Sequence, residues 1–442
     1  MTKLEGHSPM ERRYAFITED EQGDVCSDLP EEACSEAPQN FFLNALNGAF
    51  TKLGDQLGSP ELVLPWLLDA LGTPASITGF LSPIRRAGAL LPQIVVSGRI
   101  REFAIRKWFW LFGGLFFSIA FVLMVPVSLF MQGTAAGLMI LALLGIGSLS
   151  RGFSSVAFKD VLAKTIPPGR RGTLLAIRAT VGGLLALAAG FILRTYFQGT
   201  RDIRTIIFLV GASGALWLLG VALIIFIKEQ PGATEGARNA LQEARAGIKL
   251  LRENNAFLRY VLARTFLLSI ELSLPYYALY ARRFADGNAS DLGVFIIASS
   301  LAEVISSPIW GRLSDRTSRW VMISSGLLAA LTGLYALALG WLGGKSINIY
   351  LLGIAVTMIG FSRAGERLGR KTYLVDGAPE VERPLYISSS NTIIGVLTLV
   401  AGGLGFVAQE AGLRILLAIL VALAIIGSAI SFSMPEAENL AG

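Results

Sequence analysis

Seven of the ionisable side chains inside long apolar stretches of this sequence are candidates for chemistry, because a charge is costly there. They are Asp55, Arg85, Arg86, Arg151, Arg264, Glu271 and Glu303, of which Arg151 lies nearest the end of its stretch. A charge near the centre of a lipid bilayer costs at least about 2.5–3.5 kcal/mol on insertion scales, so such a residue usually faces a cavity or a charged partner. We therefore predict that these side chains line the path of a substrate or of protons.

The deep carboxylates are candidates for proton binding. Because burial disfavours the charged form of a carboxylic acid, Glu271 or Asp55 could take up and release a proton during transport. The alternative is a structural ion pair, for example between Asp55 and Arg85 or Arg86. For Glu303 the alternative is a polar group that is buried by packing alone.

The deep arginines predict an anionic substrate, because the planar guanidinium matches a carboxylate or a phosphate. Arg85 and Arg86 are neighbours in the chain, so their directions on a helix differ by about 100°. We expect one of them to face a cavity and the other a neighbouring helix. The alternative is that both only neutralise Asp55 and Glu303.

The elements that position these residues are membrane-spanning helices. The chain is 53% hydrophobic and only 16% charged, which is too apolar for a soluble domain. Crossing a bilayer takes roughly 20 apolar residues. Twelve stretches qualify, and Lys52, Asp55 and Pro60 interrupt the first of them. The predicted spans are 39–68, 75–97, 107–130, 134–157, 173–196, 204–228, 257–281, 289–311, 319–342, 347–364, 384–408 and 411–433.

The polar segments set the orientation and the domain boundaries. Most loop Lys and Arg residues lie on one side of the membrane, which predicts cytoplasmic termini in a bacterial cytoplasmic (inner) membrane. Residues 1–37 are acidic and lack an apolar period, so we expect a disordered tail in which Cys26 and Cys34 are free thiols. Residues 38–228 and 257–442 form two six-helix bundles. Residues 229–256 join them through an amphipathic helix.

One short charged motif occurs twice, between two apolar stretches in each half. Gly311 is followed by Asp315 and Arg319, and Gly98 by Glu102 and Arg106, with the same spacings of four and eight residues. The region 150–190 also matches 362–402 without gaps, and the matches include three charged positions in register. Six-plus-six parallel repeats are a transporter architecture.

The chain resembles the major facilitator superfamily across roughly 39–433. The stretch 311–319 resembles the signature G-x-x-x-D-R-x-x-R, with Ser318 where the family usually has a second glycine, and the first copy departs further. The resemblance implies two helical bundles that alternate access to a substrate bound between them, with spans 1, 4, 7 and 10 around the cavity. The predicted gating residues are Gly98, Glu102, Arg106, Gly311, Asp315, Arg316, Arg319 and Arg363.

Arg363 also opens a charged helical stripe after span 10, interpreted as a charge lock between the bundles or as an orientation signal. The stripe consists of Arg363, Glu366, Arg367, Arg370 and Lys371.

Several function classes are excluded. His7 is the only histidine, so no histidine-based metal or catalytic site exists, and we expect no enzyme activity and no cofactor. The net charge of +6 follows from membrane orientation and predicts no nucleic acid partner. We predict a monomeric secondary transporter of a small organic solute, proton-coupled and anion-binding, with efflux favoured. The alternatives are a lipid flippase on the same fold and a non-transporting scaffold or sensor.

Overall fold

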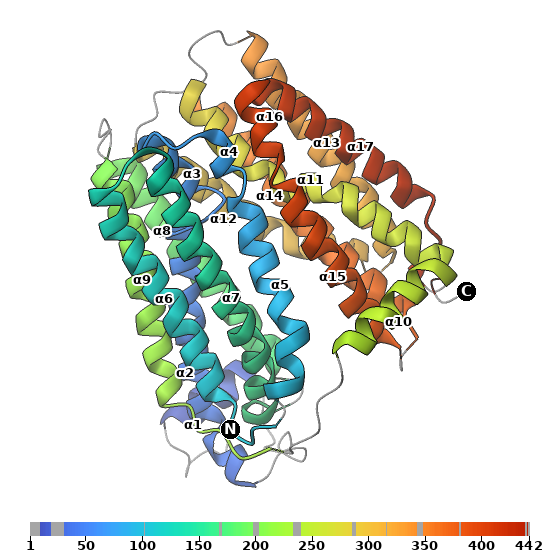
Figure 1. Cartoon of the computed structure of the whole chain (residues 1–442). Coiled ribbons are helices and arrows are strands. Elements are labelled where there is room, and N and C mark those ends of the chain that lie inside the picture. The colour runs from blue at the N-terminus through green and yellow to red at the C-terminus, as the bar shows by residue number, and fades with distance from the viewer. Residues whose placement is uncertain are drawn as a thin grey trace.

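A computed structural model shows an all-helical protein (Figure 1). The structure describes residues 9–18, 31–100, 102–167, 170–197, 203–232, 240–284, 289–314, 316–342, 348–379, 382–437 and 440. Strands are absent from these residues. The fold is that of an all-α membrane protein built from two helical halves.

The first half, blue to green in Figure 1, contains the helices of predicted spans 1 to 6. These helices are α2 (Glu31–Leu57), α3 (Val63–Ala70), α4 (Ala75–Thr78), α5 (Leu81–Ile100), α6 (Lys107–Phe130), α7 (Gly133–Thr165), α8 (Arg171–Tyr196) and α9 (Ile203–Ile225). Spans 1 and 2 are each divided into two helices, whereas α6 coincides with the predicted span 107–130.

The second half, yellow to red, repeats the pattern. After α10 (Ala240–Glu253) come α11 (Asn255–Phe284), α12 (Ala289–Ser314), α13 (Ser318–Leu342), α14 (Ile349–Gly377), α15 (Arg383–Ala401), α16 (Leu404–Glu410) and α17 (Leu413–Phe432). Helix α10 lies in the stretch predicted to be an amphipathic linker helix, and it packs against α15.

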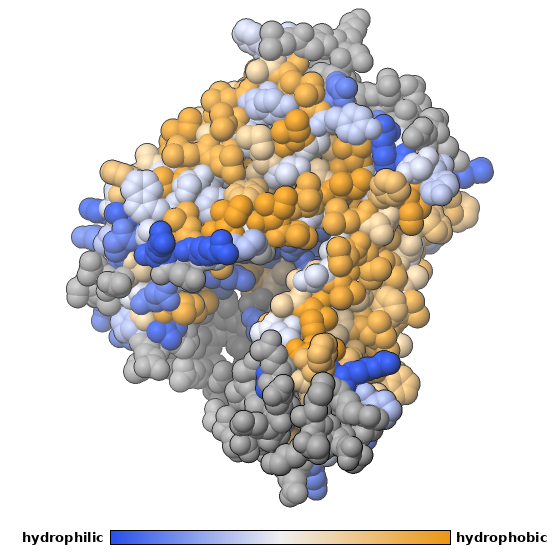
Figure 2. Space-filling view, turned by 180° about the vertical axis from the view of Figure 1, so that it is seen from behind, coloured by the Kyte–Doolittle hydropathy of each residue, from blue (hydrophilic) through white to orange (hydrophobic). Residues whose placement is uncertain are grey.

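Nine helical segments in the described chain are long and apolar enough to cross a membrane. The three remaining predicted spans correspond to α2–α3, α5 and α11. These are the segments that carry the deep charges of spans 1, 2 and 7. Figure 2 shows broad apolar surface on the visible side of the molecule. Large apolar side chains such as Phe116 and Phe191 are exposed on the molecule, as contact with lipid requires.

The prediction of a disordered tail over 1–37 is wrong for its described parts. Pro9–Thr18 forms helix α1, and α2 already begins at Glu31. Tyr14 of α1 packs edge-on against Phe41, with ring centroids 5.3 Å apart, and this apolar contact holds α1 against the bundle. Cys34 is disulfide-bonded, so the prediction of a free thiol is wrong there as well. Cys26 lies outside the described residues.

The two halves pack tightly at the end formed by α3, α4 and α16, which we call the closed end. Toward the end that holds the N-terminus they spread apart (Figure 1). A Cβ on Gly79, directly after α4, would lie 2.6 Å from the Cα of Gly405 on α16, so only glycine fits this crossing. The Nε of Arg282 also pairs with Asp69 at 2.5 Å, across the two halves. Small residues and ion pairs thus seal this end.

Candidate functional site: a charged cavity between the two halves

The first predicted span, 39–68, is broken at residues 58–62, in its second half. Pro60 lacks an N–H group and cannot continue a helical hydrogen-bond ladder. The Ser59 carbonyl accepts the N–H groups of Val63 and Leu64, at 2.9 and 3.0 Å, and so fixes the start of α3. Irregular backbone at membrane depth is tolerated where it lines a cavity. The break places Glu61 at such a cavity.

A cavity of about 340 Å³ lies between the two halves at this break. Helices α2, α5 and α7 line it from the first half, and α11, α12 and α14 from the second. Seven cationic side chains and four carboxylates contribute to the lining. They are Lys52, Arg85, Arg86, Arg151, Arg363, Arg367 and Arg370, with Asp55, Glu61, Glu271 and Glu303. Cations therefore exceed carboxylates by three in the lining, and one of these cations, Arg370, is paired with Glu366 of its own helix at 3.2 Å.

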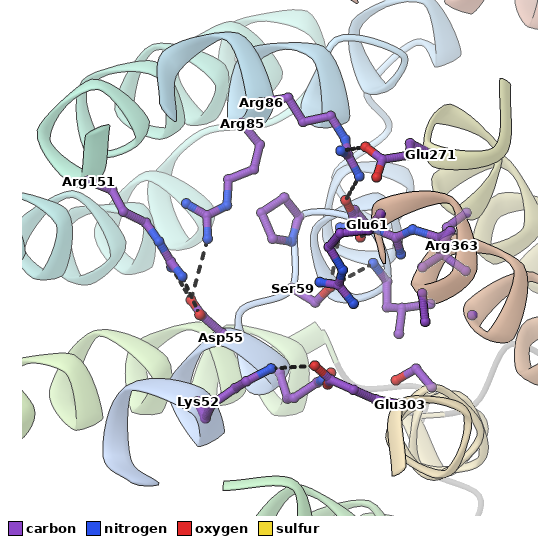
Figure 3. A pocket seen from close by; sticks show the side chains of 18 of the residues that line it. Lys52, Asp55, Ser59, Glu61, Arg85, Arg86, Arg151, Glu271, Glu303 and Arg363 are labelled. Atoms are coloured by element: carbon purple, nitrogen blue, oxygen red, sulfur yellow. Dashed lines mark hydrogen bonds and ion pairs between the residues drawn. The ribbon is translucent and has the colours of Figure 1, made fainter. Parts of the chain in front are cut away.

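Asp55 is paired within the first half (Figure 3). Both its oxygens accept from Arg151, and the Nη2–Oδ2 distance is 2.6 Å. Arg85 adds a longer contact to the same carboxylate at 3.5 Å. Two arginines against one carboxylate leave positive charge in excess on this side of the cavity.

Three further ion pairs cross from one half to the other (Figure 3). Arg86 pairs with Glu271, and its other Nη atom lies 3.6 Å from Glu61. Glu61 in turn pairs with Arg363 of α14. The Nζ of Lys52 lies 2.6 Å from Glu303 of α12. Because these three pairs bridge the halves, any large relative motion of the halves must break them.

Several arginine nitrogens in the cavity are not used by these pairs. The buried Nη1 of Arg85, Nε of Arg86 and Nε of Arg363 lack a hydrogen-bond partner among the described residues. Arg367 lines the cavity without a salt bridge to any carboxylate in the described ranges. Buried N–H donors without acceptors are costly, so this arrangement is suited to a ligand that brings acceptor oxygens.

The structure brings together most of the deep charges that the sequence singles out. Asp55, Arg85, Arg86, Arg151, Glu271, Glu303 and Arg363 all line the one cavity. The expectation that only one of Arg85 and Arg86 faces the cavity is wrong, because both side chains line it; Arg85 contacts Asp55, whereas Arg86 contacts Glu61 and Glu271.

Arg264 does not line the cavity, contrary to the prediction. It is buried, and it donates to Ser390 Oγ at 2.6 Å and to Asn391 Oδ1 at 3.0 Å, which joins α11 to α15. Sequence reasoning also missed Glu61, although a carboxylate directly after Pro60 inside a span is a usable signal. Arg178, six residues into the fifth predicted span, was missed too.

The repeated hairpin motif forms contacts within each half. Arg106 pairs with Asp160, and the carboxylate of Glu229, after α9, accepts the backbone N–H of Arg106 at 2.9 Å. In the second half, Arg319 pairs at 2.6 Å with Glu436, which follows α17 in the same way. In each half, the last arginine of the hairpin motif thus contacts a glutamate in the segment that follows the last helix of that half.

The other predicted gating residues have fewer contacts. Gly98 lies in α5 and Gly311 in α12, while the side chains of Glu102 and Arg316 are exposed. Asp315 lies outside the described residues. The gating role of the hairpins stays a prediction.

Known proteins are similar to this chain in sequence and in fold. The family model described as Major Facilitator Superfamily matches residues 266–440. A POT family transporter, solved with a thioalcohol-conjugated peptide, aligns with a TM-score of 0.70 over 93% of this chain and 99% of that chain, at 12% identity. Residues 266–440 therefore match this superfamily in sequence, and the whole chain shares its fold with solved membrane transporters.

A second solved structure and a protein of related sequence are also similar to this chain, and they say less about a substrate. A D-xylose–proton symporter aligns with a TM-score of 0.65 over 90% of this chain and 98% of that chain, at 13% identity. An uncharacterized protein of Mycobacterium tuberculosis is 26% identical over 405 residues, which cover 90% of this chain and 78% of that protein. The major facilitator fold explains why the cavity lies midway between two repeated halves.

Proposed function

We propose that this protein is a proton-coupled secondary transporter of a small organic anion in a bacterial cytoplasmic membrane. The end of the molecule that is spread apart faces the cytoplasm, as the distribution of loop Lys and Arg predicts. The structure then corresponds to an inward-facing state whose outer end is sealed by Gly79, Gly405 and the Asp69–Arg282 pair.

The excess of cations in the central cavity carries this proposal. Seven Lys and Arg side chains face four carboxylates there, and three buried arginine nitrogens have no acceptor among the residues described. Retaining uncompensated charge at membrane depth is costly, and it is characteristic of substrate or ion pathways. A carboxylate, sulfonate or phosphate group on the substrate supplies the missing negative charge and the missing acceptors.

The ion pairs between the halves suggest how protons take part. Arg86 is held by Glu271, and neutralisation of that carboxylate by a proton frees the guanidinium for the substrate's anionic group. The same protonation weakens a contact that holds the halves in the inward-facing arrangement. A ligand or proton shifts such a two-state equilibrium only through its different affinity for the two states.

Proteins with the same fold provide further support. One solved peptide transporter POT is in complex with sulfate, and another structural neighbour is a D-xylose–proton symporter. Their TM-scores of 0.66 and 0.65, at identities of 15% and 13%, show a shared fold. The anionic substrate is inferred from the charges of this cavity alone.

The proposal is tested in proteoliposomes that enclose a pH-sensitive dye. Citrate, phosphate, methanesulfonate and benzenesulfonate are added outside, with glucose and choline as neutral and cationic comparisons. We expect at least one anion to move protons through the wild-type protein. Arg367→Gln removes a cavity charge without leaving a carboxylate unpaired, and it should reduce that signal. Arg312→Gln, an exposed charge on α12 outside the cavity, is the matched control. Proton movement with glucose or choline only, or with none of the solutes, contradicts the proposal.

A further inference from the structure

A second cavity, which we call the side pocket, lies within the first half and adjoins the central cavity. Its volume is about 300 Å³, and α2, α6, α7, α8 and α9 contribute to its lining. Lys52, Asp55 and Arg151 line both cavities. The two cavities therefore adjoin at these three side chains.

Aromatic rings form one wall of the side pocket. Trp110 and Phe158 meet edge to face, with ring centroids 5.1 Å apart, and Trp217 lies opposite the Arg151 guanidinium at 4.8 Å. Aromatic rings and guanidinium planes are the surfaces on which a ligand ring stacks or packs edge-on. This composition differs from that of the central cavity, where charged groups dominate.

Two buried polar groups at the side pocket lack partners. Trp217 is only 7% exposed and its indole N–H donates to no acceptor among the described residues. Asn47 is 1% exposed; its Nδ2 donates to the Gly220 carbonyl at 2.7 Å, and its Oδ1 has no donor within the described part of the chain. Buried polar groups are nearly always paired, so an unmatched donor and an unmatched acceptor on two residues that line one pocket favour a ligand that matches them.

Arg178 adds a positive charge to the side pocket. Its Nη1 donates to the Asn44 carbonyl at 2.6 Å, and its guanidinium lies 4.8 Å from the Phe158 ring centroid. No carboxylate in the described part of the chain pairs with it. Gly48 leaves the space for this side chain, because a Cβ there would clash with Arg178. The guanidinium is thus held in place while its charge stays uncompensated.

We propose that the side pocket is a subsite for an aromatic ring, so that the transported solute is an aromatic organic anion. This inference rests on the proposed anion transport and specifies its substrate class. The anionic group lies among the arginines of the central cavity, and the ring lies between Trp217 and Phe158. Polar substituents on the ring meet the indole N–H of Trp217 and the Oδ1 of Asn47.

The test compares two sulfonates of equal charge, which do not titrate near neutral pH. Binding of methanesulfonate, benzenesulfonate and inorganic sulfate to the purified full-length protein is measured by calorimetry. We expect benzenesulfonate to bind at least about tenfold more tightly than methanesulfonate, a difference that corresponds to about 1.4 kcal/mol.

Two phenylalanine substitutions on α8 separate the side pocket from its surroundings. Ala179 lines the side pocket, whereas Ala176, one turn earlier and also exposed, lines neither cavity. Ala179→Phe should remove most of the preference for the ring and leave sulfate binding unchanged, and Ala176→Phe should change neither. Ser155→Leu fills the pocket from α7 and serves if Ala179→Phe does not fold.

The outcomes distinguish this inference from the proposed function. If sulfate binds but benzenesulfonate is no tighter than methanesulfonate, or if both pocket-filling variants keep the preference, the aromatic subsite is refuted and the anion site stands. If none of the three anions binds the wild-type protein, the proposed anion transport fails together with the subsite.

Discussion

The ion pair between Arg86 and Glu271 predicts an asymmetric response to mutation. Glu271 is 5% exposed, and its only salt bridge to a described residue is the one to Arg86. Arg86 also lies 3.6 Å from a second carboxylate, Glu61. Arg86→Gln therefore leaves a buried carboxylate alone, whereas Glu271→Gln leaves the arginine with a partner. Removing one partner of a buried pair costs about 3–5 kcal/mol.

The expected costs follow from these contacts. Arg86→Gln should lower the free energy of unfolding by about 3–5 kcal/mol. Glu271→Gln should lower it by about 1 kcal/mol, the value of a contact that is partly replaced. The double variant should be more stable than Arg86→Gln alone, because it buries two neutral amides rather than an isolated charge. Neighbouring residues of this kind show coupling energies of about 0.5–3 kcal/mol.

The assay is reversible unfolding of the purified protein in mixed micelles by increasing fractions of dodecyl sulfate. Arg312→Gln, an exposed charge outside the cavity, provides the control and should be close to the wild type. The reasoning is refuted if Arg86→Gln costs no more than Glu271→Gln. It is also refuted if the two costs add to within about 0.5 kcal/mol in the double variant.

Two further predictions concern the ends of the bundles. Gly405→Leu forces a side chain against the backbone carbonyls of α4, so it should open the closed end. A membrane-impermeant thiol reagent added on that side should then label a cysteine placed at Ser299 of the cavity several-fold faster than in the protein with Gly405. An unchanged labelling rate contradicts the seal. Glu229 has a fully buried carboxylate that accepts two backbone N–H groups and Lys164, whereas Glu436 is 42% exposed. Glu229→Gln should therefore cost about 2–3 kcal/mol in the same unfolding assay and Glu436→Gln less than about 1 kcal/mol, and equal costs would show that the two contacts are alike.

Hydropathy alone locates the helices where apolar residues run without interruption. Span 107–130 coincides with α6 because no ionisable residue lies between Trp108 and Gln132. The prediction fails where a helix leaves the apolar region: span 347–364 continues as α14 to Gly377. The charged stripe from Arg363 to Lys371 is helical, as the spacing of its charges predicts, although nothing in its hydropathy distinguishes it from a loop.

The membership of the candidate site is partly predictable, but its pairing is not. Insertion cost singles out Asp55, Arg86 and Glu271 because the cost depends only on depth within a span. The choice of partner depends on tertiary structure. Asp55 pairs with Arg151 in its own half, whereas Glu271 pairs across the halves with Arg86. Depth alone also fails for Arg264, which uses its donors on α15 instead of the cavity.

The break in span 1 shows a second limit. Pro60 indicates a kink, but not that the helix stops at Leu57 and restarts at Val63. Only the folded backbone shows that the five residues between them bring Glu61 to Arg363 of the other half. Local sequence therefore predicts the position of the break. The contact that the break makes possible depends on how the two halves pack.

The most direct test of the central claim is the binding of sulfate to the central cavity. Calorimetric titration at constant ionic strength would compare the wild type with Arg367→Gln and Arg312→Gln. A cavity with unpaired arginine donors should bind sulfate, and Arg367→Gln should weaken that binding about tenfold, equivalent to about 1.4 kcal/mol, while Arg312→Gln leaves it unchanged. Equal affinity in all three proteins, or no sulfate binding to the wild type, would contradict an anion site between the two halves.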